Sequence, residues 1–244
     1  MKNILLFCAV CLAAYHHYTS STAHPAAETS NLNLNLPTKN LPEASQHILN
    51  IVVNDISGSD AWLSLTKSEI LALLLQDSCR SGSTQLAGIC IDERGEKQTP
   101  FLSAEMGHII QSLDVDIYEE AAARNFNKKS LAKYQVSCRN AADSFARHII
   151  LPRNAPYSNV NGALGLSLKL GTLPNYQNYL IRLIILSDLL QDMPNGAPIG
   201  SFVFPPNTVV YVIGSSDELE LKRIFPANKV VALPAFKALF FSQS

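Results

Sequence analysis

The sequence predicts an α/β domain in which a mostly parallel sheet, with one antiparallel edge strand, is covered by helices on both faces. Short runs rich in β-branched residues alternate with stretches whose apolar residues recur at helical spacing. Those runs are apolar at nearly every position, as strands of a parallel sheet are when helices cover both faces. Hydrophobic residues make up 47% of the 244 residues, which is enough for a sizeable core. Together these observations predict a three-layer α/β/α architecture.

The first 46 residues are predicted to lie outside this domain. A positively charged start, an apolar run over residues 4–15 and small residues at Ser21 and Ala23 have the layout of a signal peptide, 1–23. A retained N-terminal anchor or a lipoprotein is an alternative. Residues 24–46 contain three prolines and the run NLNLNL and are predicted to be a linker. We therefore expect an exported protein, periplasmic, envelope-associated or secreted, without a membrane span after signal removal.

The first half of the domain, which begins at residue 47, is predicted to open as strand, helix, strand and antiparallel return. A β-branched run at 48–53 predicts a buried strand. Residues 65–76 have helical periodicity, with Thr66 as a candidate N-cap. Residues 86–92 form a second apolar run, and 98–102 can pair with it across a glycine-containing turn.

The second half is predicted to add helices and three further strands. Residues 103–150 are mostly helical by pattern, with a helix capped by Ser130, and a shorter helix is expected at 160–169. The remaining expected elements are strands at 180–186, 208–213 and 229–233 and a helix at 216–224. Because right-handed crossovers place the carboxyl ends of parallel strands on one edge, that edge is where a ligand is expected.

One group of residues at this edge has the chemistry of a cation site. Asp55, Ser57 and Ser59 directly follow the first strand and offer a carboxylate and two hydroxyls within five residues. Hard divalent cations prefer oxygen ligands of this kind. Asp188 ends the strand at 180–186 and can supply a second carboxylate. The competing interpretation is a helix-capping turn, since Asp and Ser are common N-caps.

These residues resemble the metal-ion-dependent adhesion site of the von Willebrand factor type A family, whose fold is Rossmann-like. The family has Asp-x-Ser-x-Ser after its first strand, which Asp55, Ser57 and Ser59 match. It adds a Thr from a middle loop, where this chain has Ser158 in SNVNGAL, and an Asp after the fourth strand, matched by Asp188. Many members have Gly after that Asp, whereas this chain has Leu189. The resemblance covers roughly residues 47–241.

The resemblance implies an extracytoplasmic module that binds protein partners through a divalent cation, Mg²⁺ or else Mn²⁺ or Ca²⁺. Asp55, Ser57, Ser59, Ser158 and Asp188 would hold the cation, and a protein partner would supply an acidic residue to it. The alternatives are a metal-dependent hydrolase that uses the same edge, or a related domain whose metal site is not functional. The resemblance implies no catalytic residue and leaves the oligomeric state open.

Other features give weaker indications. Asp114 and Asp116 have the spacing of a phosphotransfer pair but lack a buried strand before them. His108 and His148 have no second ligand at metal spacing. The net charge of −1 gives no reason to expect nucleic-acid binding. The cysteines that remain after signal removal, Cys79, Cys90 and Cys138, could pair or remain buried thiols.

Overall fold

The computed structural model describes residues 47–57, 65–77, 82–107, 117–150, 155–194 and 196–240. The predicted signal peptide, the linker and the candidate residues Ser59, Asp114 and Asp116 lie outside these ranges. His108 and Cys79 also lie outside them.

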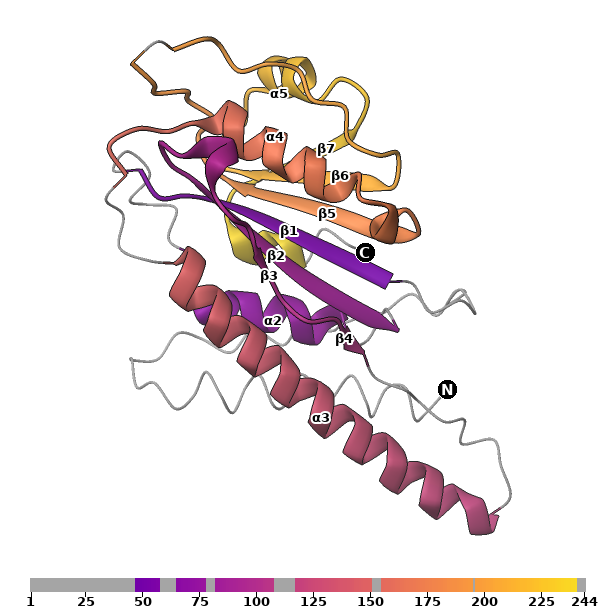
Figure 1. Cartoon of the computed structure of the whole chain (residues 1–244). Helices are drawn as coiled ribbons and strands as arrows, with labels where there is room; N and C mark the ends of the chain where they lie inside the picture. The colour runs from indigo at the N-terminus through magenta and orange to yellow at the C-terminus, as the bar shows by residue number, and fades with distance from the viewer. Residues whose placement is uncertain are drawn as a thin grey trace, which may run out of the picture.

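The described elements form one mixed, mostly parallel sheet between two helical layers, which confirms the predicted architecture (Figure 1). The strands are β1 (His47–Asp55), β2 (Ser83–Ile91), β3 (Phe101–Leu102), β4 (Met106–Gly107), β5 (Tyr179–Leu186), β6 (Thr208–Ile213) and β7 (Lys229–Leu233). Their order is β3-β2-β1-β5-β6-β7, and β4 also pairs with β2. Only β3 and β4 run antiparallel to their neighbour.

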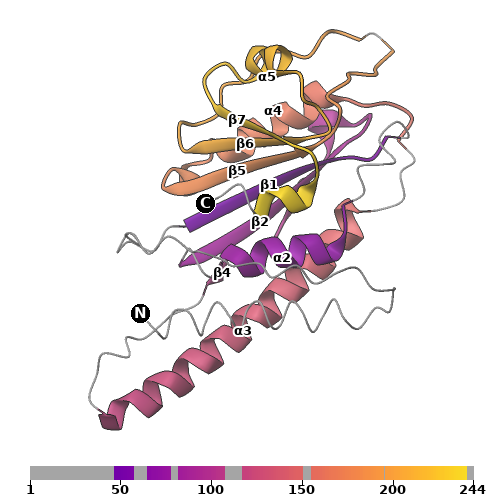
Figure 2. The same ribbon diagram turned by 180° about the vertical axis from the view of Figure 1, so that it is seen from behind.

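The helices divide between the two faces of the sheet (Figures 1 and 2). One face carries α2 (Lys67–Asp77), α3 (Ile117–Ile149) and the 3₁₀ helix η4 (Phe236–Phe240). The other carries α4 (Val160–Gly171) and α5 (Glu218–Ile224). Short 3₁₀ helices η2 (Gly95–Lys97) and η3 (Pro174–Tyr176) lie in connections.

Successive side chains of the central strand β1 point to opposite faces of the sheet and so contribute to two separate hydrophobic cores. In β1, Val52 packs in the core under α2 and α3, whereas Ile51 and Val53 pack in the core under α4 and α5. This is the period of two that a strand imposes on its side chains. Eight of the nine residues of β1 are buried, as expected for a strand covered on both faces.

The long helix corrects one sequence-based expectation, and a short strand was not expected. α3 runs without interruption for 33 residues, so Ser130 lies inside the helix and is not its N-cap. No proline or glycine occurs in this stretch to end a helix before residue 130. The strand β4 was not predicted, because two residues are too few to give a period-two pattern.

Two contacts fix the end of α3 against the sheet. A Cβ on Gly88 of β2 would lie 2.5 Å from the Ile149 side chain and 2.7 Å from the Phe145 ring, so this close approach requires glycine. The Asn54 amide donates a 3.0 Å hydrogen bond to the Ile149 carbonyl, which satisfies one of the terminal carbonyls of the helix.

Thr66 acts as the predicted N-terminal cap of α2. The Glu69 N–H donates to the Thr66 hydroxyl at 3.3 Å, and the Thr66 N–H donates to the Glu69 carboxylate at 2.9 Å. These reciprocal bonds form a capping box.

Candidate cation site at the carboxyl edge

The point where the strand order reverses lies between β1 and β5. From β1 the chain passes through α2 to β2 on one side, and later returns to β5 on the other side of β1. Ligands of such sheets bind beside the carboxyl ends of the strands at this point. Asp55 ends β1 and Ser187 follows β5, so both residues lie at the reversal.

Asp55 is the most buried carboxylate at this edge, with 1% of its surface exposed. One carboxylate oxygen accepts a 2.9 Å hydrogen bond from the Ser57 N–H, and the other accepts a 2.9 Å bond from the Ser187 hydroxyl. Both donors are neutral. Within the described part of the chain, no Lys, Arg or His forms an ion pair with Asp55.

A buried carboxylate without a positive partner is energetically costly unless something offsets its charge. A divalent cation is one way to do so, and it would meet oxygen donors here, the ligands that hard cations prefer. The described residues contain no group of three or more His, Cys, Asp or Glu placed to hold a metal. Any cation at Asp55 would therefore rely on hydroxyl groups as well as carboxylates.

Ser57 and Ser158 come to the same edge through two isolated bridges. Ser57 pairs with Ala155, and Ser158 pairs with Asp192. Ser158 donates its N–H to the Asp192 carbonyl at 2.9 Å, and the Asp192 N–H donates back at 3.1 Å. Ser57 and Ser158 are 5% and 3% exposed. The predicted middle loop is thus joined to the loop after β1 and to the loop that contains Asp188.

Asp188 lies next to Ser187 and is less buried than Asp55. One of its carboxylate oxygens accepts a 2.9 Å hydrogen bond from the Leu190 N–H. The residue between them, Leu189, has φ of 60°, a left-handed conformation that is costly for a leucine. Glycine would adopt this conformation without strain.

Ser187 is the residue of this edge that the sequence analysis did not include among the site residues. Its hydroxyl donates to Asp55 and accepts a 3.0 Å hydrogen bond from the Leu189 N–H. It therefore connects the carboxylate of β1 to the strained turn after β5. Its position immediately after a buried strand and before Asp188 is the sequence feature that could have identified it as a site residue.

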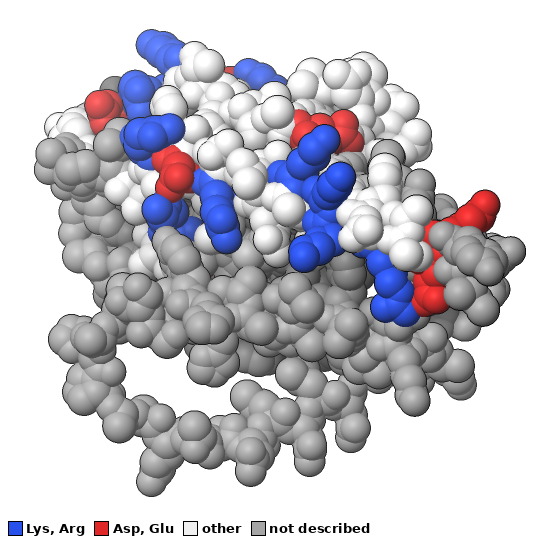
Figure 3. Space-filling view, turned by 90° about the horizontal axis from the view of Figure 1, so that it is seen from below, with Lys and Arg blue, Asp and Glu red and all other residues white. Residues whose placement is uncertain are grey.

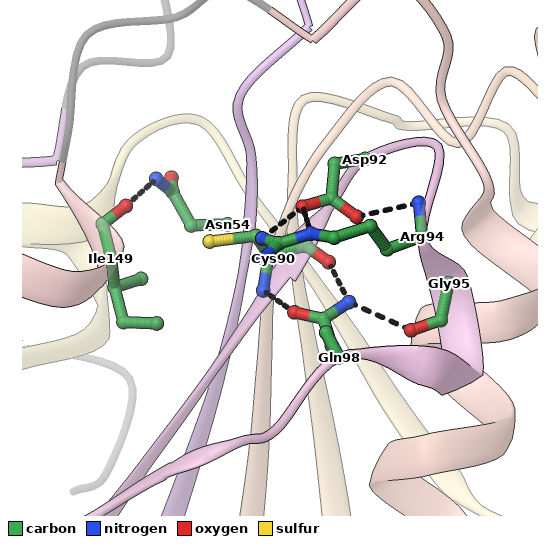
Figure 4. Close-up of polar contacts among 7 residues, drawn as sticks. All are labelled: Asn54, Cys90, Asp92, Arg94, Gly95, Gln98 and Ile149. Atoms are coloured by element: carbon green, nitrogen blue, oxygen red, sulfur yellow. Dashed lines mark hydrogen bonds and ion pairs between the residues drawn. The ribbon is translucent and has the colours of Figure 1, made fainter.

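The end of β2 contributes an ion pair that the sequence analysis also missed (Figure 4). The buried Asp92 carboxylate accepts hydrogen bonds from the Arg94 N–H at 2.9 Å and from its guanidinium at 2.8 and 2.5 Å. This hydrogen bonding raises the pKa of Arg94. The Arg94 side chain remains 57% exposed, so a fixed guanidinium lies at the carboxyl end of the strand next to β1.

Hydrogen bonds from the Gln98 side chain to the main chain stabilise the turn after β2 (Figure 4). The Gln98 side chain accepts a hydrogen bond from the Cys90 N–H at 2.9 Å and donates to the Cys90 and Gly95 carbonyls at 2.7 and 2.9 Å.

The same turn is also bonded to the start of α4, because the Asp92 carbonyl accepts a hydrogen bond from the Asn159 N–H at 3.3 Å. Asn159 is the N-cap of α4, through a 2.9 Å bond from the Gly162 N–H. The turn after β2 and the start of α4 are therefore linked directly beside Ser158.

The two described cysteines, Cys90 and Cys138, are free and buried. Burial, with a smaller contribution from Asp92, raises the pKa of Cys90 to about 11. This supports the interpretation of these two residues as buried thiols. His148 lies on the exposed side of α3, where its ring hydrogen-bonds the Ser144 carbonyl.

No described helix is both long enough and apolar enough to cross a membrane.

Comparison with known proteins gives matches only at the level of structure. No protein-family model and no curated protein sequence matches the chain. Solved structures similar to this chain include two of proximal thread matrix protein 1 from the mussel byssus. They share 13% and 14% sequence identity with it, at TM-scores of 0.43 and 0.44. Each alignment covers 82% of this chain and 46% of the mussel chain, so this chain spans about half the length of the mussel protein. One of the two structures is described as having a zinc-occupied MIDAS motif.

Proposed function

We propose that this protein is an extracytoplasmic module that binds protein partners through a divalent cation at Asp55. The observation that carries the proposal is the Asp55 carboxylate, which is 1% exposed and is held by two neutral donors at the reversal of the strand order. A bound cation would offset the charge of this carboxylate.

The residues of the chain have separate roles in this proposal. Asp55 and Asp188 would supply negative charge, and Ser57, Ser59 and Ser158 would supply hydroxyl oxygens. Mg²⁺ suits such a set because it binds few carboxylates and retains waters, and Mn²⁺ or Ca²⁺ could replace it. When bound, the cation would act as an electrophile that accepts a carboxylate oxygen from a partner.

The surroundings of Asp55 support a protein partner. Tyr157 and Leu190 flank Ser158 and Asp188 in sequence and are 40% and 66% exposed, and exposed aromatic and apolar side chains are common in the centres of protein interfaces. Arg94 at the neighbouring strand end is paired with Asp92, but its guanidinium remains 57% exposed and could also donate hydrogen bonds to a carboxylate of a partner.

The first test is thermal unfolding of the full chain with and without Mg²⁺. A ligand that binds only the folded state raises the melting temperature, so we expect Mg²⁺ to stabilise the wild type and not Asp55→Ala. Ser158→Ala should reduce the shift less, because a neutral hydroxyl contributes less than a carboxylate.

A control carboxylate distinguishes a site effect from a general one. Asp217 caps α5 by accepting from the Leu219 and Glu220 N–H groups. Asp217→Ala should lower the melting temperature but leave the Mg²⁺-dependent increase intact. Equal increases in the wild type and Asp55→Ala would refute the proposal.

A further inference from the structure

The surface of α3 carries positive charge that the proposed cation site does not use. The helix contains six Lys or Arg and three Asp or Glu, although the whole chain has a net charge of −1. Between Arg124 and Asp143 it contains four basic residues and no acidic one: Lys128, Lys129, Lys133 and Arg139. All four are exposed.

These four cations differ from the other basic residues of the helix. Arg124 pairs with Glu120, and the Arg147 guanidinium donates to the Ser144 hydroxyl. None of the four forms an ion pair within the described part of the chain. Figure 3 views the side of the molecule on which α3 lies, and in the part of this face that is not grey, Lys and Arg appear at more places than Asp and Glu.

The arrangement of the helix makes this charge available to a flat surface. A helix of 33 residues is about 50 Å long. Its second half packs on the sheet through residues such as Tyr134, Cys138 and Phe145, whereas its first half extends past the amino edge of the sheet (Figures 1 and 2). The four cations lie on the side of the helix that does not pack.

Exposed apolar side chains occur among these cations. Phe126 is 39% exposed and Val136 is 52% exposed. A membrane interface accommodates both kinds of side chain, because apolar groups enter the boundary below the headgroups while lysines reach the phosphates. A purely acidic polymer would match the lysines but would offer Phe126 no apolar environment.

We infer that the exposed face of α3 between Phe126 and Arg139 binds anionic phospholipid surfaces. Each Lys or Arg near such a surface contributes about fivefold to binding at moderate ionic strength. Binding there would leave the carboxyl edge, with Asp55, on a different side of the molecule (Figure 1).

The test is flotation of the full chain with vesicles of phosphatidylcholine alone or of equal parts phosphatidylcholine and phosphatidylserine. The phosphatidylcholine vesicles give the baseline for binding by the apolar run at 4–15. We expect stronger partition into the anionic vesicles, and this preference should weaken as salt is raised. Equal partition into both vesicle types would overturn the inference.

A matched pair of variants tests the location of the charge. Lys128→Gln, Lys129→Gln and Lys133→Gln combined should lower partition into the anionic vesicles on the order of a hundredfold. The control combines Lys222→Gln, Lys229→Gln and Lys237→Gln, three exposed lysines on other elements, and should change it only severalfold. Equal losses in both variants would show that net charge and not α3 determines the effect, and would overturn the inference.

A last variant tests lipid against an acidic macromolecule. Phe126→Ser should weaken partition into the anionic vesicles while leaving the dependence on salt unchanged, because it removes an apolar contact and no charge. If Phe126→Ser has no effect and soluble polyglutamate competes fully for binding, the partner is an acidic macromolecule and the lipid assignment is wrong.

Discussion

Two buried carboxylates of this domain have opposite surroundings. Asp77, at the end of α2, is 0% exposed, and the Arg182 guanidinium of β5 pairs with it at 2.5 Å. The Asn50 amide and the Thr84 hydroxyl donate to it at 2.7 and 3.0 Å. Asp55, nearly as buried, accepts from a serine hydroxyl and a main-chain N–H and has no cationic partner in the described part of the chain.

A buried carboxylate can serve structure or binding, depending on where its counter-charge comes from. Asp77 has its counter-charge in the chain itself, inside the core beneath α2, where nothing needs to enter. Asp55 lies where loops from three parts of the chain meet, so a soluble cation could supply its counter-charge. Removing the cationic partner should therefore destabilise the protein at Asp77, whereas adding a divalent cation should stabilise it at Asp55.

The largest effect is expected at the internal pair. Arg182→Ala should lower the free energy of unfolding by about 3–5 kcal/mol, because it leaves Asp77 charged and buried without its partner. Urea denaturation measures this change. The variant Asp77→Asn/Arg182→Met removes both charges and should recover most of the loss. A double variant as unstable as Arg182→Ala would show that packing, and not the charge, explains the cost.

Asp55→Asn should behave differently in metal-free solution. It removes a buried charge that has no positive partner, so the free energy of unfolding should stay equal to the wild-type value or rise. With Mg²⁺ at about a hundred times its dissociation constant, the wild type should gain about 2.7 kcal/mol and the variant nothing. A large loss for Asp55→Asn under chelation would mean that the carboxylate is structural, as Asp77 is.

A third carboxylate, Glu105, differs from Asp77 and Asp55 because it is 46% exposed. It accepts hydrogen bonds from the hydroxyls of Ser83 and Tyr179, at 2.5 and 2.9 Å, and contacts His47. These bonds lower the pKa of Glu105, the one from Ser83 most. Since water already solvates the carboxylate, Glu105→Gln should change stability by less than about 1 kcal/mol.

The pH dependence of Glu105 follows from the direction of its shift. A carboxyl whose pKa is lower in the folded state stabilises the fold above its ordinary pKa of 4.5, and that stability is lost as the pH falls through the folded-state value. The wild type should therefore lose slightly more stability below this pH than Glu105→Gln. Identical acid profiles would contradict the assigned bonding.

The sequence predicts the regular elements of this fold well and the long-range polar contacts poorly. The strands at 208–213 and 229–233 match β6 and β7 at both ends, because their apolar runs end at turn residues. The length of α3 was missed because Ser130 resembles a cap although nothing before it breaks the helix. No local pattern could show that Arg182 pairs with Asp77, since the pairing depends on packing between α2 and β5.

For the candidate site, the sequence identified the motif residues but not the residues that depend on turn conformation. Asp55, Ser57, Ser158 and Asp188 stand out because each lies at an expected strand end or in a matching motif, and the structure places their loops together. Ser187, the strained Leu189 and the Asp92–Arg94 pair emerged only from the structure. Their roles depend on the backbone conformation of turns, which residue type alone does not determine.

Calorimetric titration of the full chain with Mn²⁺ can show cation binding at Asp55 without requiring a partner. We predict saturable binding at one site in the wild type, no binding in Asp55→Asn, and binding unchanged from the wild type in Asp217→Asn. A wild type that shows no heat of binding, or an Asp55→Asn variant that binds as the wild type does, would contradict a cation site at Asp55.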